Sequence, residues 1–235
     1  MPTLAQRRLP RALLVVLLGL LLVALVALLA LQLLGGPSVP SGPVTGTGDP
    51  FDQDRTSGAF TAISATGGIS VVVAVGPTRQ VTVSAQQNLF PLIHTDVVDG
   101  RLVVTIDAPG FTTTQPVAVH ITTPVLTRVS LDGGASGTME LDTDTLNVTL
   151  ANASSLSAIG RASQLVLAED GKSTADLVEL KADTASVTIT GASSATINAS
   201  TSLTGTADSA STIKLSQQPT TLSVKTSGGA TVTGP

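Results

Sequence analysis

The chain has 235 residues and no cysteine, which excludes disulfides, thiolate metal sites, a cysteine nucleophile and a lipid anchor on an N-terminal cysteine. Its formal net charge of −4 offers no basic surface, so we expect no nucleic-acid partner. Only 12% of the residues are charged and 2% are aromatic, so the surface must be built largely from Ser, Thr, Asn and Gly.

Residues 13–34 form an apolar stretch in which Gln32 is the single polar side chain. As a helix this stretch would be about 33 Å long, enough to cross the roughly 30 Å hydrocarbon core of a bilayer. A cleaved signal peptide is the alternative, but its apolar core is usually shorter, and residues 27–30 make a poor cleavage site. We therefore expect residues 13–34 to be an uncleaved transmembrane helix and signal anchor in contact with the lipid bilayer.

Residues 1–12 are basic and contain Arg7, Arg8 and Arg11, whereas no basic residue follows the apolar stretch before Arg55. The positive-inside rule then places the N-terminus in the cytoplasm and the rest of the chain outside. The expected location is the plasma membrane, with one pass and an extracytoplasmic domain. Residues 35–55, rich in Pro, Gly, Ser and Thr, are expected to be a linker.

Residues 56–125 show the alternation of short strands. Asp99 and Gly100 separate two apolar runs and predict a two-residue hairpin turn. Residues 88–96 are less regular and carry bulky apolar side chains. All four Phe residues lie in or just before this region, so we expect it to cap the rest of the domain. The expected strands are residues 60–63, 69–75, 81–83, 102–106 and 117–121.

Residues 126–235 repeat a unit of about 20 residues: an aliphatic run, a turn of small residues, and a second run. The six units are residues 126–143, 144–162, 163–182, 183–201, 202–218 and 219–235. Small residues suit the turns because equivalent positions stack about 4.8 Å apart. The expected fold class is all-β: a right-handed parallel β-solenoid (β-helix) of about six rungs, within a domain of residues 56–235.

The alternation assigns inward positions in every unit. In the first strands they are Val129/Leu131, Leu146/Val148, Leu165/Leu167, Val187/Ile189, Leu203/Gly205 and Leu222/Val224. In the second strands they are Met139/Leu141, Ile159, Leu177, Ile197, Ile213/Leu215 and Val232.

Three stretches carry a resemblance to a known family. They are residues 67–83 (GGISVVVAVGPTRQVTV), residues 99–104 (DGRLVV) with Asn88, and residues 117–126 (VAVHITTPVL) leading into Gly134, Ala135 and Ser136. The chain resembles the putative auto-transporter adhesin head GIN domain family from about Gly58 to the C-terminus. The resemblance implies a bacterial β-solenoid at the cell surface or in the periplasm and implies no catalytic residue. Family members are often secreted or lipid-anchored, whereas this chain is expected to use a membrane helix at residues 13–34.

Two groups of side chains are candidates for metal binding. His94 and His120 are the only histidines, and no further ligands stand at zinc-site spacing. Glu140, Asp142 and Asp144 share one face of a strand and could bind Ca²⁺, but the glycine-rich nonapeptide of calcium-binding solenoids is missing. We interpret both groups as ordinary surface residues and expect no metal, cofactor or catalytic site.

The expected function is non-catalytic: adhesion, or the binding of a glycan, cell-wall polymer or protein. A structural or sensory envelope component that contacts other membrane proteins is the alternative. A polysaccharide lyase or hydrolase is less favoured, because residues 126–235 have no aromatic platform for sugars and no constellation of catalytic groups. The last unit has no obvious cap, so its edge is a candidate for self-association.

Overall fold

The computed structural model describes residues 42–235. The predicted basic N-terminus (1–12) and transmembrane helix (13–34) lie outside this range. Within it, no helix has both the length and the apolar character needed to cross a membrane.

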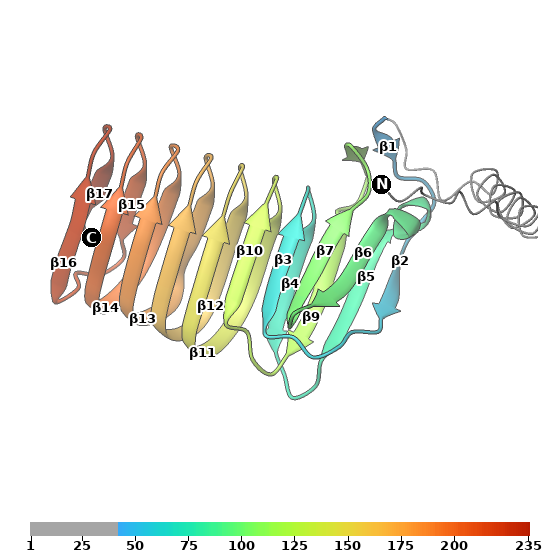
Figure 1. The fold of residues 1–235 in the computed structure, drawn as a ribbon, viewed down its shortest axis with the longest axis horizontal. Helices are drawn as coiled ribbons and strands as arrows, with labels where there is room; N and C mark the ends of the chain where they lie inside the picture. Colours follow the sequence, from blue (N-terminus) through green and yellow to red (C-terminus); the bar gives the residue numbers. More distant parts are fainter. Residues whose placement is uncertain (1–41) are drawn as a thin grey trace, which may run out of the picture. The chain divides into compact units, whose positions relative to one another are not determined.

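The described chain forms two stacks of parallel strands that make the opposite walls of a solenoid (Figure 1). Face A contains β7 (Arg101–Ile106), β3 (Ala62–Thr66), β10 (Arg128–Asp132) and, at its far end, β16 (Thr221–Thr226). Face B contains β9 (Ala118–Thr123), β4 (Ser70–Val75), β15 (Thr212–Leu215) and β17 (Thr231–Thr233). Between these strands, four long strands serve both faces: β11 (Ser136–Leu150), β12 (Ser155–Glu169), β13 (Thr174–Ile189) and β14 (Ser194–Ala207).

The repeat is confirmed as a parallel β-solenoid of about six turns. Each long strand has 14 to 16 residues: its first half lies on face B, and its second half lies on face A of the next rung. Neighbouring rungs pair in register over most of their length; for example, Leu146 pairs with Leu165 and Leu165 with Ala185. We call the middle of these long strands the bend edge and the opposite side of the solenoid the turn edge.

At the turn edge each rung reverses through two consecutive residues with positive φ. The six pairs are Gly133 with Gly134, Asn152 with Ala153, Gly171 with Lys172, Gly191 with Ala192, Ser209 with Ala210, and Gly228 with Gly229. Two residues in this conformation make the tight turn that matches the twist of β-strands. The next residue points inward and is small, and Ser154 and Ser173 use their hydroxyls to donate to the carbonyls of Ala151 and Asp170, both at 2.6 Å. The expected small turn residues are confirmed.

Two more rungs continue the solenoid toward the N-terminal end. One has β3 on face A and β4 on face B, and the other has β7 on face A and β9 on face B. Their spatial order differs from their chain order. β3 lies between β10 and β7, and β4 lies between β11 and β9, so the segment after β9 returns across the β3/β4 pair to begin β10. The region expected to be only strands and a cap therefore also extends the solenoid itself.

The cap consists of antiparallel strands and one short helix. β5 (Gln80–Gln86) pairs antiparallel with β9, and β6 (Ile93–Val98) pairs antiparallel with β7 through the expected Asp99–Gly100 turn. The 3-10 helix η1 (Gln87–Leu92) joins β5 to β6 across the end of the solenoid. The predicted irregular segment at residues 88–96 corresponds to η1 and the start of β6.

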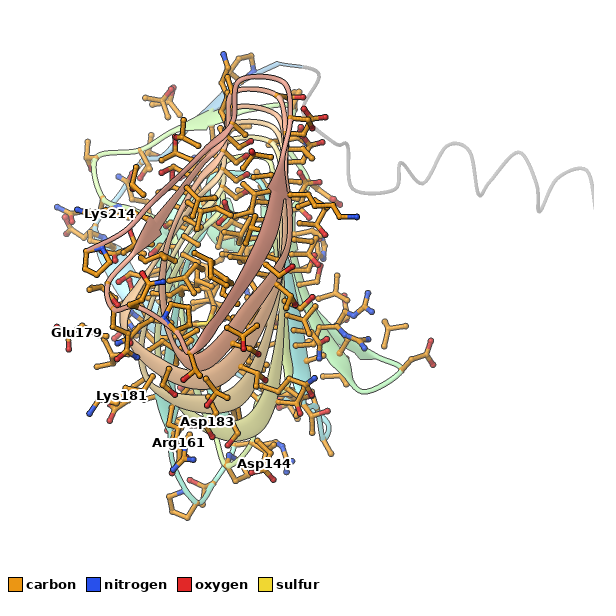
Figure 2. All side chains as sticks on the ribbon, turned by 90° about the vertical axis from the view of Figure 1, so that its left-hand side faces the viewer. Asp144, Arg161, Glu179, Lys181, Asp183 and Lys214 are labelled. Atoms are coloured by element: carbon orange, nitrogen blue, oxygen red, sulfur yellow. The ribbon has the colours of Figure 1, made fainter. Side chains whose placement is uncertain are left out.

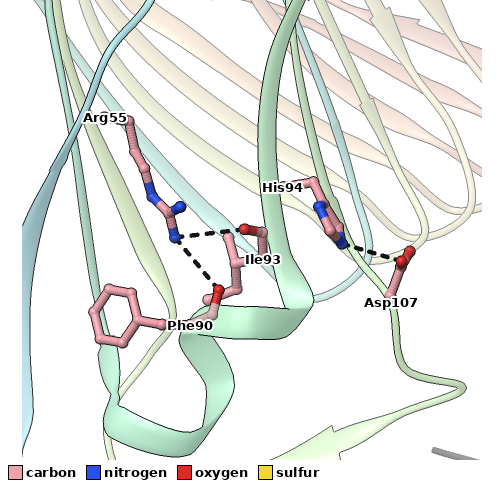
Figure 3. Close-up of polar contacts among 5 residues, drawn as sticks. All are labelled: Arg55, Phe90, Ile93, His94 and Asp107. Carbon is pink, nitrogen blue, oxygen red and sulfur yellow. Dashed lines mark hydrogen bonds and ion pairs between the residues drawn. The ribbon is translucent and has the colours of Figure 1, made fainter. Parts of the chain in front are cut away.

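Aromatic side chains complete this cap, as expected. The Phe51 and Phe90 rings stack with their centroids 4.3 Å apart, and the Arg55 guanidinium lies 5.9 Å from the Phe90 centroid. Arg55 also donates to the carbonyls of Phe90 and Ile93, at 3.4 and 3.5 Å (Figure 3).

Two strands lie in the stretch expected to be a linker (35–55). β2 (Pro50–Arg55) pairs antiparallel with β5, and β1 (Val44–Thr45) pairs with β8 (Phe111–Thr112). The compact domain therefore begins before residue 56.

The interior is a continuous aliphatic core, and most of the assigned inward positions are buried in it. Gly205, Val224 and Val232 are only partly buried, and Leu222 is exposed. Ile159 is the clearest exception. Its side chain is 46% exposed, and Ala158 takes the inward position beside Met139. The prediction for Ile159 was wrong because Leu156 and Ala158 already set the parity, and Gly160, with φ +109°, then kinks the strand. In the last rung, Leu222 is 41% exposed because no described rung follows it.

Candidate functional site

Charged side chains gather along the bend edge, where the long strands pass from face B to face A. Figure 2, which looks along the solenoid from its C-terminal rung, shows Asp144, Arg161, Lys181 and Asp183 together at this edge. Their position follows from the repeat, because the middle of each long strand has no partner layer outside it and its side chains meet solvent. Two hollows lie along this edge.

The first hollow has a volume of about 330 Å³, and its lining residues are polar or charged apart from one alanine. Its lining residues are Arg161, Lys181, Ala182, Asp183, Asn198, Ser200 and Gln217. The Arg161 guanidinium donates to the Asp183 carboxylate at 3.0 Å across neighbouring rungs, and both side chains are more than half exposed. This ion pair fixes the direction of Arg161 more than it stabilises the fold, because exposed ion pairs contribute little.

An amide network lies on the far side of the same hollow. The Asn198 side-chain amide donates to the carbonyl of Val178 at 2.7 Å, and the Gln217 amide donates to the Asn198 oxygen at 2.8 Å. The Ser200 hydroxyl donates to the carbonyl of Ala182 at 3.3 Å. These bonds hold the three polar groups in place while leaving further donor and acceptor sites open to a ligand.

The second hollow adjoins the first and has a volume of about 490 Å³. It is lined by Val75, Glu140, Leu141, Asp142, Gly160 and Arg161. Arg161 lines both hollows, so they form one surface of alternating charge along the solenoid. We call this surface the bend-edge groove.

The three acidic residues singled out in the sequence are all exposed, as their shared face predicts. Glu140 and Asp142 line the second hollow, whereas Asp144 lies outside both linings. Among residues 42–235, no three His, Asp or Glu side chains come close enough to hold a metal ion.

The two histidines lie in different places. His94, at the start of β6, has its Nε2 atom 3.0 Å from the Asp107 carboxylate, on the surface of the cap (Figure 3). His120 is exposed in the middle of β9, between buried Val119 and Ile121, as the alternation predicts. Neither lines the bend-edge groove.

One ionisable residue of the interior was missed. Glu169 is 3% exposed, and neither of its carboxylate oxygens has a hydrogen-bond partner. Burial raises the pKa of this carboxyl to about 8. The signal was in the sequence: Leu165, Leu167 and Glu169 have the same parity, so an inward Leu167 implies an inward Glu169. Glu169 lines a separate hollow of about 210 Å³, together with Leu150, Asp170 and Thr190, and it lines neither hollow of the groove.

The groove can bind by many hydrogen bonds and weak ionic contacts. Its cationic groups come from Arg161 and Lys181 and its anionic groups from Glu140, Asp142 and Asp183, so it favours neither strongly charged class of ligand. No aromatic side chain lines it, so it lacks the stacking platform that many sugar-binding sites use.

Solved structures from Bacteroides and Parabacteroides species have the same fold. The chain is 19% identical to a putative adhesin from Bacteroides fragilis (TM-score 0.63), covering 82% of this chain and 100% of the other. It is 18% identical to a putative adhesin from Parabacteroides merdae (TM-score 0.58; coverage 83% and 100%). A third putative adhesin, from Parabacteroides distasonis, is 17% identical (TM-score 0.56; coverage 82% and 99%). At this level of identity the similarity shows the fold.

A comparison with curated proteins finds no match. Residues 59–219, which are more than half of the chain, match the family described as "Putative auto-transporter adhesin, head GIN domain". That match begins close to the point where the sequence resemblance begins and includes most of the solenoid. The chain therefore belongs to the putative auto-transporter adhesin, head GIN domain family.

Proposed function

We propose that this protein is a non-catalytic binding module, held outside the plasma membrane, that adheres to a glycan or cell-wall polymer through its bend-edge groove. The observation that carries the proposal is the continuity of the two hollows through Arg161. A groove that follows the stacking direction presents polar or charged groups at successive rungs, and such an extended surface suits an extended polymer better than a small compact ligand.

The chemistry of the groove supports a hydroxyl-rich and weakly charged ligand. Asn198, Gln217 and Ser200 offer amide and hydroxyl groups that can both donate and accept hydrogen bonds. Because each of these contacts is exposed to water, each contributes little, and affinity has to come from several rungs acting together.

Two observations favour binding over catalysis. Glycoside hydrolysis uses a carboxylic acid whose pKa is raised, facing a second carboxylate across the sugar. In the described chain, the carboxyl with a raised pKa is Glu169, which is 3% exposed and lines a separate hollow instead of the groove, with Asp170 as the only other carboxylate there. Glu140 and Asp142, which do line the groove, are both exposed on one strand.

The anchored placement rests on the sequence of residues 1–34. The intact mass of the mature protein tests it directly: retention of the N-terminal segment supports the anchor, and a mature start near Leu31 contradicts it. Protease added to cells stripped of any outer membrane and wall should digest or release the folded domain, because the positive-inside rule places that domain outside the plasma membrane.

Binding can be tested with the full-length protein in detergent, using purified cell-wall polymers and soluble glycans in a pull-down followed by calorimetry. We expect retention by at least one polymer, and we expect Arg161→Ala and Asn198→Ala each to weaken it about five- to tenfold. Arg128→Ala is the matched control, because Arg128 is an exposed arginine of β10 that lies outside both hollows.

Retention of no polymer at all would count against adhesion and favour the structural or sensory role, in which the partner is another membrane protein. Equal losses in Arg161→Ala and Arg128→Ala would keep polymer binding but contradict the assignment to the groove.

A further inference from the structure

The two ends of the solenoid are finished differently. At the N-terminal end, β2 and β6 are the outermost strands, and both carry groups that discourage strand addition: Pro50, Asp52 and Asp54 in β2, and His94 and Asp96 in β6. η1 covers the core between them.

Among the described residues, the C-terminal end has neither a covering helix nor antiparallel cap strands, and its outer strands contain a single charged side chain. β16 and β17 are the outermost strands of faces A and B, each paired on one side only. Leu222 is 41% exposed, and Val224 and Val232 are only partly buried, whereas Leu203, Val187 and Ile213 in the same columns of earlier rungs are buried. Lys225 is the single charged residue in the two strands.

We infer that this end binds a second copy of the same chain, tail to tail. A head-to-tail stack is blocked because the N-terminal end is covered by the cap. A two-fold axis between two C-terminal ends covers the open strand edges of both copies at once, because the same surface of each copy forms the interface. In this arrangement β16 would pair with β16 of the second copy in antiparallel orientation, adding a strand to the open edge of face A.

The sequence of β16 is self-complementary in one register. With the two-fold axis at Ser223, Leu222 of each copy lies opposite Val224 of the other, so the exposed apolar side chains cover one another. Lys225 then lies opposite Thr221, which avoids a pair of like charges. The two capped ends would point away from each other.

The size of the end face sets the strength of this contact. A strand of six residues is about 20 Å long, and two sheets about 10 Å apart with their outer side chains are about 20 Å wide. Two such faces bury roughly 800 Å² in total, below the ~1,200 Å² of small stable interfaces. The dimer should therefore be reversible, with a dissociation constant in the micromolar range, so dilution should dissociate it.

The absence of native cysteine gives a direct test. In the full-length protein, Ser223→Cys places two thiols opposite each other across the two-fold axis, and mild oxidation should produce a covalent dimer. Ser186→Cys is the matched control, because Ser186 is exposed and stands in the same column of face A two rungs earlier, through Thr204. Absence of a covalent dimer with Ser223→Cys, or equal yields from the two variants, would overturn the pairing.

Sedimentation of the full-length protein in detergent provides the second measurement. We expect a monomer–dimer equilibrium whose dissociation constant rises at least tenfold in Val224→Asp, while far-UV circular dichroism stays unchanged. A protein that is monomeric up to about 100 μM, or a dimer unaffected by Val224→Asp, would overturn the inference. The second outcome would place self-association elsewhere in the chain, for example in residues 13–34.

Discussion

Glu169 stands in register with Ile189, so a carboxyl group occupies the position that a branched aliphatic side chain fills one rung later. On the preceding rung the same position is held by Leu150. The carboxyl therefore lies in an aliphatic column with no hydrogen-bond partner, and burial raises its pKa to about 8.

This arrangement predicts an unusual dependence of stability on pH. Below about pH 4.5 Glu169 is protonated in both the folded and unfolded chain, so its raised pKa costs nothing. Between pH 4.5 and 8 the unfolded chain releases the proton and the folded chain keeps it, so the free energy of unfolding falls as pH rises. At pH 7 the loss should be about 3 kcal/mol. Chemical denaturation of wild type and Glu169→Gln at several pH values measures the difference.

The glutamine variant should show a flatter pH profile, and Glu169→Leu should be more stable than wild type by about 3 kcal/mol at pH 7.5, because it restores the aliphatic column. Parallel profiles for wild type and both variants would mean that Glu169 has access to water or to a partner in solution.

The close approach of Gly160 to the preceding rung predicts a strict requirement for glycine. Gly160 has a φ of +109°, and a Cβ there would collide with the carbonyl oxygen of Leu141. Gly160→Ala should cost at least about 3 kcal/mol, from backbone strain and from displacement of the neighbouring strand. Gly110→Ala, where no atom lies within 4 Å of the added carbon, is the control and should change stability by less than about 1 kcal/mol. Urea denaturation compares the two variants.

The opposite orientations of two isoleucines predict opposite responses to the same substitution. Ile189 is fully buried, so Ile189→Asp puts an unpaired charge in the core and should unfold the rungs around it, with a loss above about 4 kcal/mol. Ile159 is 46% exposed, so Ile159→Asp should change stability by less than about 1 kcal/mol. Far-UV circular dichroism and thermal denaturation distinguish them. Unchanged dichroism in Ile189→Asp would refute the rung assignment.

The stacking of Phe51 on Phe90 predicts that the cap can be loosened separately. Phe90 is buried under Phe51 and Arg55, and Phe90→Ala should cost about 3 kcal/mol. Hydrogen exchange should accelerate first in β5 and β6, because solenoid rungs contact only their neighbours and the loss is local. Phe51→Ala, which removes a ring that is 45% exposed, should have a smaller effect on the same strands. Uniform acceleration through β13 and β14 would contradict a local role.

The repeated part of the fold could be read from the sequence because one rule governs every rung. Aliphatic residues at alternate positions and small residues at the turns give each unit the same strand–turn–strand conformation. The strands and turns predicted for the six units correspond to those of the structure. The error at Ile159 came from preferring the bulkier residue over the parity set by Leu156. The inward orientation of Glu169 was not predicted for a related reason: a charged residue is expected at the surface, although its parity with Leu167 indicates an inward side chain.

The strand order of the N-terminal part was harder to predict, because it depends on pairing between strands that are far apart in the sequence. Nothing in the sequences of β3 and β4 says that they insert between strands that come later in the chain. That order is set by pairing between strands that are far apart in the chain, and no single stretch of the sequence specifies it. The bend-edge groove was also missed, because Arg161 and Gln217 are far apart in the sequence and meet only through the stacking of rungs.

The long strands β11 to β14 pair only with strands of the neighbouring rungs, while the cap is confined to one end. The length of the protein can therefore change in whole steps of about 4.8 Å, by duplication or removal of one unit, without alteration of the cap or the terminal rung. The N-terminal end does not have this freedom, because its strands interleave with later ones. Whole units can therefore be added to or removed from the C-terminal half of the solenoid, by evolution or by design, and each added unit lengthens the groove there.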